Sequence, residues 1–203
     1  MKSILMTTLR NKDSSLEEFR SAAMRLGSTL AHNTLSEFTK KEISVITPLG
    51  ETTGYCFDEP VMLMPILRAG LVLLPPFLTI FPHARVGIIG LKRNETTAIA
   101  DMYYENLPEL TPDENVIILD PMLATGGSAL KALHLLEEKG VNPSKIKMVC
   151  MIASTEGLKT VKSQFPQLDL IVAQEDLELT KEKFIYPGLG DFGDRFFGTE
   201  YTY

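Results

Sequence analysis

At 203 residues the chain is long enough to bury a sizeable core, and we expect residues 1–203 to form one domain. Its net charge of −6 disfavours a general nucleic-acid binder, because such proteins normally carry a basic face. The stretch that most needs weighing as a membrane span, residues 61–82, carries Arg68 near its middle and four prolines, so we expect no membrane partner.

The two cysteines, Cys56 and Cys150, lie in strand-like surroundings and outside any CxxC or His-rich motif. We interpret both as small buried hydrophobic residues, which suits a reducing cytoplasm. The apolar run at residues 4–6 is too short for a signal peptide. We therefore expect a cytoplasmic protein.

The first predicted helix covers residues 14–31. Ser14 and Ser15 each have a glutamate three residues later, which is a capping-box pattern, and apolar residues then recur at helical spacing. Residues 43–47 alternate as a strand. Thr53–Gly54 is read as a second bend before residues 55–57, so this region predicts a hairpin or a small sheet extension.

Residues 61–64 predict a short buried strand that Pro65 breaks, and an apolar helix is expected from Leu71. Arg68 lies between these apolar runs, and arginine is rarely buried without a partner. Its side chain either reaches to the surface or faces an anion at the mouth of a strand–helix loop. The second alternative is favoured, because Gly70 opens the helix and a guanidinium binds phosphate oxygens bidentately.

Residues 84–90 are the next predicted strand. Residues 91–105 mix charged, polar and aromatic residues without a clean period. A polar segment of this length between two strands predicts an insertion, a lid or a hairpin arm. From the residues alone, Arg93 within it is a solvated charge.

Residues 116–119 form a continuous apolar run, typical of a strand buried on both faces of a parallel sheet, and the run stops at Asp120–Pro121. The sequence TGGS at residues 125–128 then leads into a helix that ends at Gly140. A loop at the carboxyl end of a strand, followed by free helix N–H groups and flanked by hydroxyls, suits a phosphate. A plain turn between strand and helix is the alternative, and the spacing matches neither a Walker A loop nor GxGxxG.

Residues 146–152 and 168–173 predict two further strands, separated by a helix that runs to Phe165. This alternation predicts a parallel α/β sheet. Residues 185–199 combine four glycines with three phenylalanines. Because aromatic side chains are costly to expose, we expect this segment to pack against the domain, where its backbone suits the recognition of a small planar base.

Four motifs, in this order, resemble those of type I phosphoribosyltransferases, and most closely the uracil phosphoribosyltransferase family. They are PILRAGL (65–71), KRNETT (92–97), DPMLATGGS (120–128) and PGLGDFGD (187–194). The resemblance implies a parallel sheet flanked by helices, with a β-hairpin arm near 91–108 and a C-terminal base-binding hood near 184–203. It also implies transfer of the 5-phosphoribosyl group from 5-phosphoribosyl-1-diphosphate (PRPP) to N1 of uracil, giving UMP and diphosphate in pyrimidine salvage.

The resemblance also implies roles for individual residues. The expected catalytic residues are Arg68, Arg93, Asp120 and Asp191. PRPP is expected to bind these four and the loop formed by Pro121, Met122, Leu123, Ala124, Thr125, Gly126, Gly127 and Ser128. Uracil is expected to contact Ile185, Gly190, Asp191 and Phe192, mainly through the main chain. Lys92, Thr96 and Phe192 replace residues that are more usual in the family.

Mg²⁺ is expected to arrive with PRPP and water, and no dedicated protein metal site is predicted. The family resemblance implies a homodimer or a higher homo-oligomer, although the N-terminus looks shorter than in typical members. Two alternatives stay open: an RNA-binding regulator of pyrimidine genes with the same fold, and a phosphoribosyltransferase that acts on another base.

Overall fold

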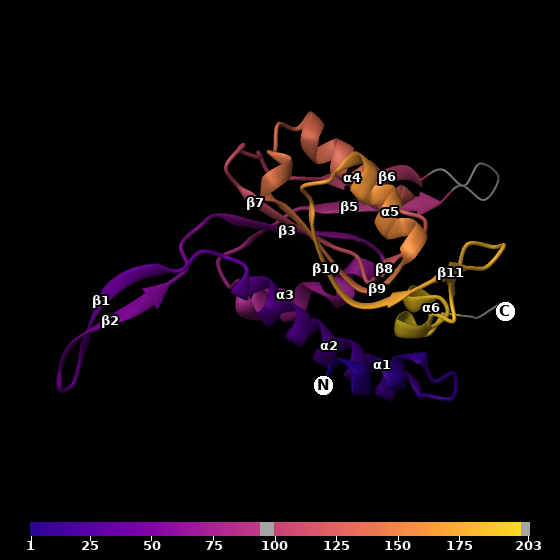
Figure 1. Cartoon of the computed structure of the whole chain (residues 1–203), viewed down its shortest axis with the longest axis horizontal. Coiled ribbons are helices and arrows are strands. Elements are labelled where there is room, and N and C mark those ends of the chain that lie inside the picture. The colour runs from indigo at the N-terminus through magenta and orange to yellow at the C-terminus, as the bar shows by residue number, and fades with distance from the viewer. Residues whose placement is uncertain (94–99, 200–203) are drawn as a thin grey trace.

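The computed structural model describes residues 1–93 and 100–199 (Figure 1). The elements are α1 (Lys2–Arg10), α2 (Leu16–Ser36), β1 (Lys41–Thr47), β2 (Gly50–Cys56), β3 (Val61–Leu67), the 3₁₀ helix η1 (Ala69–Val72), α3 (Leu74–Ile80), β4 (Arg85–Val86), β5 (Ile88–Arg93), β6 (Ala100–Asn106), β7 (Asn115–Leu119), β8 (Met122–Leu123), α4 (Gly127–Glu138), the 3₁₀ helix η2 (Pro143–Lys145), β9 (Ile146–Ser154), α5 (Thr155–Gln164), β10 (Asp169–Asp176), β11 (Glu178–Leu179), β12 (Ile185–Tyr186) and α6 (Phe192–Phe197).

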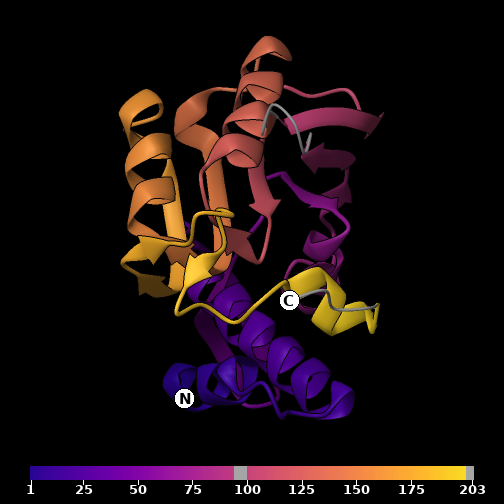
Figure 2. The same ribbon diagram turned by 90° about the vertical axis from the view of Figure 1, so that its right-hand side faces the viewer.

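A central sheet has the strand order β10–β9–β7–β3–β5–β6, with β4 paired to β3 and β8 paired to β9. Its pairings are parallel except that of β5 with β6. Helices α2 and α3 lie on one face, and α4 and α5 lie on the other (Figures 1 and 2). The predicted parallel α/β sheet flanked by helices is therefore confirmed.

The core is divided between the two faces of this sheet, and the alternation of side chains along each strand decides which residue faces which side. In β3, Leu63 packs with the cluster under α2 and α3, whereas Met62 and Met64 pack with the cluster under α4 and α5. Cys150 is fully buried in the second cluster, as predicted. Cys56 ends the β1–β2 hairpin and is only partly buried, so the interpretation of both cysteines as core residues was half right.

Pro65 does not break β3, contrary to the prediction, and the strand continues to Leu67. Pro65 is still paired with Leu119 of β7. On its other side it lies opposite the interruption between β4 and β5: the pairing with β4 ends at Leu63↔Val86, and the pairing with β5 begins at Ile66↔Ile89. The missing N–H of proline therefore costs no ladder hydrogen bond at this position.

The helices differ from prediction mainly at their ends. The capping box between Ser15 and Glu18 is present, but α2 continues to Ser36. Helix α3 begins at Leu74 rather than Leu71, because η1 occupies the intervening turn. Helices α1 and α6 were not predicted, since each is short: α1 has nine residues and α6 has six.

Antiparallel hairpins lie outside the parallel part of the central sheet. Strands β1 and β2 pair in continuous register from Lys41↔Cys56 to Thr47↔Gly50, so the predicted bend at Thr53–Gly54 is absent. This hairpin projects away from the rest of the molecule (Figure 1). Strands β5 and β6 pair antiparallel, which selects the hairpin among the alternatives for residues 91–105. Residues 94–99, including Thr96, lie outside the described residues.

The C-terminal segment up to Thr199 packs against the domain, as predicted; residues 200–203 lie outside the described residues. Phe192 is buried, and its ring centroid lies 5.3 Å from that of Phe19 in α2. Within the described residues, no helix is long and apolar enough to cross a membrane.

Candidate functional site

Two of the four motifs, PILRAGL and DPMLATGGS, lie at the ends of adjacent parallel strands, at the same edge of the sheet. Arg68 follows β3 and Asp120 follows β7. From β3 the chain proceeds to β5 on one side, and it reaches β7 on the other side only later. The gap between β3 and β7 is thus a topological switch point, where open α/β sheets bind ligands.

The two strands part at Asp120. Pairing between β3 and β7 ends at Pro65↔Leu119, whereas β8 resumes the pairing with β9 in the same register after Pro121. The predicted end of the strand at Asp120–Pro121 is confirmed on the β3 side. Gly70 brings the two loops together, because a Cβ on this residue would overlap the carbonyl oxygen of Leu119.

The Asp120 side chain is largely surrounded by protein, and only part of the residue's surface is exposed. Burial raises its pKa to about 7, against the opposing effect of a hydrogen bond from the Met122 N–H at 3.3 Å. Burial, together with the nearby charge of Asp120, raises the pKa of the Cys150 thiol well above its usual value. Asp120 therefore gains or loses its proton close to neutral pH.

The loop from Ala124 to Ser128 is held in place by Ser154, the residue that precedes α5. The Ser154 hydroxyl donates to the Ala124 carbonyl and accepts the N–H of Gly157. Gly126 has a φ of +88°, and α4 begins at the next residue. The first N–H groups of α4 are left without helical partners, so this loop can accept a phosphate.

Arg68 lies between the sheet edge and the C-terminal segment. Its guanidinium is 3.3 Å from an Asp194 carboxylate oxygen and 5.7 Å from the centroid of the Phe197 ring. The Arg68 side chain is 57% exposed, so this ion pair contributes little to stability, and an anionic ligand can replace it. Sequence reasoning missed Asp194, although it belongs to the PGLGDFGD motif.

Arg93 ends β5, the strand beside β3, so its backbone lies at the same edge of the sheet. Its side chain lies outside what the structure describes. The preceding Lys92 is exposed and pairs in register with Asp101 of β6.

The remaining candidate residues belong to the C-terminal segment, residues 185–199, which contacts Arg68 at this edge of the sheet. Ile185 is buried in β12, and Gly190 has a φ of +79°. The carboxylate of Asp191 accepts the Asp194 N–H at 2.8 Å and so caps α6. The side chain of Phe192 belongs to the core, which leaves its main chain as the part that it can offer to a ligand.

Three further side chains contact the backbone of this segment and were also missed. Arg10 and Asp176 hold Gly188, and Arg195 holds Leu189. Arg10 is separated from Asp176 by 166 residues, so no local pattern could have linked them.

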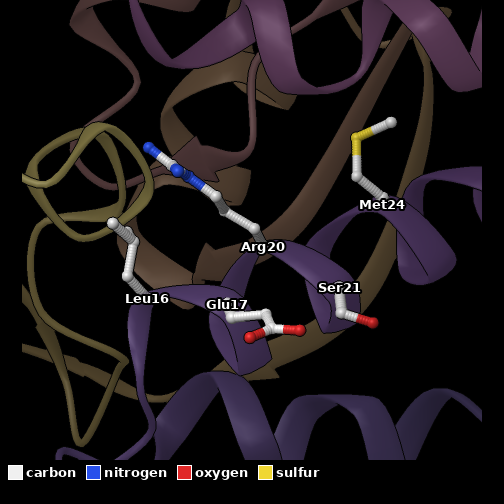
Figure 3. A pocket seen from close by; sticks show the side chains of 5 residues that line it. All are labelled: Leu16, Glu17, Arg20, Ser21 and Met24. Carbon is white, nitrogen blue, oxygen red and sulfur yellow. The ribbon is translucent and has the colours of Figure 1, made fainter.

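A hollow along α2 is lined by Leu16, Glu17, Arg20, Ser21 and Met24 (Figure 3). All five belong to one helix and none is a candidate site residue, so we assign it no ligand. Among the described residues, no group of three or more His, Cys, Asp or Glu side chains is arranged to hold a metal ion.

The family model described as Uracil phosphoribosyltransferase matches residues 2–199. The chain is 41% identical to a uracil phosphoribosyltransferase of Metamycoplasma hominis, covering 96% of this chain and 93% of the relative. It is 42% identical to one of Dictyoglomus thermophilum, covering 96% and 94%.

Among solved structures, the AQ2163 protein from Aquifex aeolicus superposes with a TM-score of 0.88 at 38% identity, covering 97% of this chain and 93% of that one. A hypoxanthine-guanine phosphoribosyltransferase from Bacillus anthracis shares the fold alone, with a TM-score of 0.53 at 12% identity, covering 79% and 80%. The chain belongs to the uracil phosphoribosyltransferase family.

Proposed function

We propose that this protein transfers the 5-phosphoribosyl group of PRPP to N1 of uracil, giving UMP and diphosphate, as a step of pyrimidine salvage. The observation that carries the proposal is the convergence of Arg68, Asp120 and the phosphate-accepting loop at one switch point, beside the segment that contains Gly190 and Asp191. Family membership supplies the identity of the base.

In the reaction, a bond forms between uracil N1 and ribose C1 while the bond from C1 to the diphosphate oxygen breaks, and the N1 proton passes to solvent. Negative charge grows on the departing diphosphate, so cations placed there stabilise the transition state most strongly. We assign this role to Arg68 and Arg93. The loop Thr125–Ser128 holds the 5-phosphate, and Asp120 accepts hydrogen bonds from ribose hydroxyls and stabilises positive charge on the ring.

The residues present fit a Mg²⁺ ion that is carried mainly by substrate oxygens and water. Such an ion needs few protein ligands, and the part-exposed Asp120 and Asp191 supply oxygen donors at the site. When bound, the ion neutralises charge on the diphosphate. Ile185, Gly190 and Phe192 are proposed to contact uracil through their main chains, with Asp191 between base and ribose.

The proposal is tested by measuring diphosphate release from PRPP in the presence and absence of uracil. Release that depends on both substrates supports it. An RNA mobility-shift measurement distinguishes the enzyme from an RNA-binding regulator of the same fold. Binding of RNA without uracil-dependent release of diphosphate would favour the regulator. We expect no RNA binding, given the net charge of −6.

Asp120→Asn should remove a pH dependence from the enzyme. Because the pKa of Asp120 is about 7, we expect kcat/KM for PRPP in the unaltered protein to fall as pH drops below 7 and Asp120 becomes protonated. The variant should have a lower kcat/KM at pH 8 and should lack this limb. A profile of the same shape in both proteins would remove Asp120 from PRPP binding, since ionisation of PRPP itself affects both equally.

The same substitution should change stability in a pH-dependent way. The folded protein keeps the Asp120 proton up to about pH 7, whereas an unfolded chain loses it near its ordinary pKa of 3.8. Wild-type stability therefore decreases as pH rises from about 4 to 7. Denaturant titration should find Asp120→Asn more stable than the unaltered protein by roughly 1–3 kcal/mol at pH 8, and equal to it near pH 4.

We also propose that the protein is a homodimer or higher homo-oligomer that uses the β1–β2 hairpin. A lone two-stranded hairpin is marginally stable in water, and this one exposes Ile46 and Leu49 almost completely. Leu49→Asp should shift the protein toward monomer in sedimentation velocity. Leu177→Asp, at an 80% exposed position outside the hairpin, is the control and should leave the mass unchanged. Equal masses for all three proteins would exclude the hairpin as the contact.

Finally, we propose that residues 1–203 act as one domain with an arm near 91–108 and a hood near 184–203. The contacts of Arg10 with Asp176 and Gly188, which join the first helix to the C-terminal segment, support this. A cytoplasmic location is proposed on the ground that Cys56 and Cys150 are both unpaired.

A further inference from the structure

Arg195 is a buried arginine whose partners are backbone carbonyls. Its side chain lies in α6 and the residue is only 7% exposed. Its guanidinium donates hydrogen bonds to the carbonyls of Leu9, Asn11 and Leu189, at 2.6 Å for Asn11 and 2.7 Å for Leu189. Its Cζ also lies 4.3 Å from the centroid of the Phe19 ring. Among the ion pairs of the described residues, none includes Arg195, so these carbonyls and the ring compensate its charge.

The three carbonyls come from two distant segments. Those of Leu9 and Asn11 lie at the end of α1, where helix carbonyls lack partners and the helix dipole is negative. That of Leu189 lies between β12 and α6. One planar fork of N–H groups thus joins the first helix to the peptide that precedes Gly190, and a lysine could not reproduce this geometry.

Holding the Leu189 carbonyl also orients the next N–H. The Leu189–Gly190 peptide is not among the cis bonds, so it is trans, and its C=O and N–H point in opposite directions. With the carbonyl turned toward Arg195 and α1, the Gly190 N–H is turned the other way. No hydrogen bond among the described residues uses that N–H, so it can donate to a ligand.

The neighbouring peptide is held in the same manner. Asp176, itself buried, accepts the Gly188 N–H at 2.9 Å and pairs with Arg10 at 2.6 Å. Arg10 also donates to the Gly188 carbonyl at 3.3 Å. A hollow of about 1050 Å³ adjoins this loop, and its lining includes Arg10, Pro187, Leu189, Gly190 and Arg195. Polar contacts, more than packing on that side, therefore fix the backbone of this loop.

We propose that Arg195 is a positioning residue that sets the orientation of the Gly190 N–H for recognition of a pyrimidine carbonyl. The inference rests on the proposed function, because it requires Gly190 to contact uracil. Recognition through main-chain groups tolerates only small displacements, so a freed Leu189–Gly190 peptide should weaken base binding while leaving the PRPP residues in place.

The test compares Arg195→Met and Arg195→Lys with Arg20→Met. Arg20 is the matched control, because it projects from α2 (Figure 3), donates to the Phe196 carbonyl of the same helix α6 and lies over the Phe196 ring, but touches no peptide from 187 to 190. We expect Arg195→Met to raise KM for uracil by about tenfold or more, with KM for PRPP within about twofold of the unaltered value. Arg195→Lys should fall between, and Arg20→Met should match the unaltered protein.

A role in folding alone would lower the melting temperature and the amount of active enzyme without a selective change in KM for uracil. Equal KM values for uracil in the folded Arg195 variants and the control would overturn the inference. If Arg195→Met does not fold, Arg195→Lys decides by the same ratio of KM values. Absence of uracil-dependent diphosphate release in the unaltered protein would instead overturn the proposed function, so the two failures are distinguishable.

Discussion

Replacing Arg68 with alanine is expected to lower kcat by about 10²–10³-fold while leaving the fold intact. The side chain is more than half exposed, and its pairing with Asp194 at 3.3 Å contributes little to stability. Its proposed contribution arises only when charge develops on the departing diphosphate. Steady-state kinetics with saturating uracil and PRPP, together with a melting curve, measures both effects.

Arg20→Ala is the matched control for this prediction. Each guanidinium lies 5.7 Å from the centroid of a phenylalanine ring of α6, Phe196 for Arg20 and Phe197 for Arg68. Loss of the packing between arginine and ring is therefore similar in the two variants, and only Arg68 lies at the end of β3. Near-normal turnover in Arg68→Ala would exclude it from the diphosphate site.

Gly70→Ala is expected to damage the site through the backbone. The added Cβ would overlap the Leu119 carbonyl oxygen, which cannot rotate away as a side chain would, so the loops that carry Arg68 and Asp120 must separate. We expect a loss of about 1–3 kcal/mol in unfolding free energy and at least about a tenfold fall in kcat/KM for PRPP. Chemical denaturation and steady-state kinetics on the same preparation test the two parts.

Gly140→Ala separates lost stability from lost geometry. Gly140 has a φ of +86° and no atom within 4 Å of an added Cβ, and it lies after α4 rather than at the site. Alanine there should cost about 1–2 kcal/mol through backbone strain, with kcat/KM unchanged. If both variants lost activity in proportion to stability, the close approach of the two loops would have no specific role.

Local sequence patterns predicted the parts of the fold that local physics determines. The apolar run Val116–Leu119 and the breaker after it located β7 and its end, and the TGGS sequence located the start of α4. Pro65 misled the prediction, because its effect depends on whether a neighbouring strand needs its N–H, and β4 and β5 happen to be interrupted there.

The parts that sequence reasoning missed depend on contacts between distant residues. Arg68 and Asp194 are 126 residues apart, and Arg195 and Leu9 are 186 apart. Helix α6 has only six residues and depends on its cap at Asp191 and on packing of Phe192 against Phe19. Short elements of this kind have little intrinsic stability, so their propensity alone does not predict them.

A base competition in one reaction tests most directly whether this site joins a pyrimidine to the ribose of PRPP. Uracil, cytosine, hypoxanthine and guanine are supplied at equal concentration with limiting PRPP and Mg²⁺, and the nucleotide products are separated and quantified. We expect nearly all of the product to be UMP, with one diphosphate released for each UMP formed. A purine nucleotide as the main product would exclude uracil as the preferred substrate.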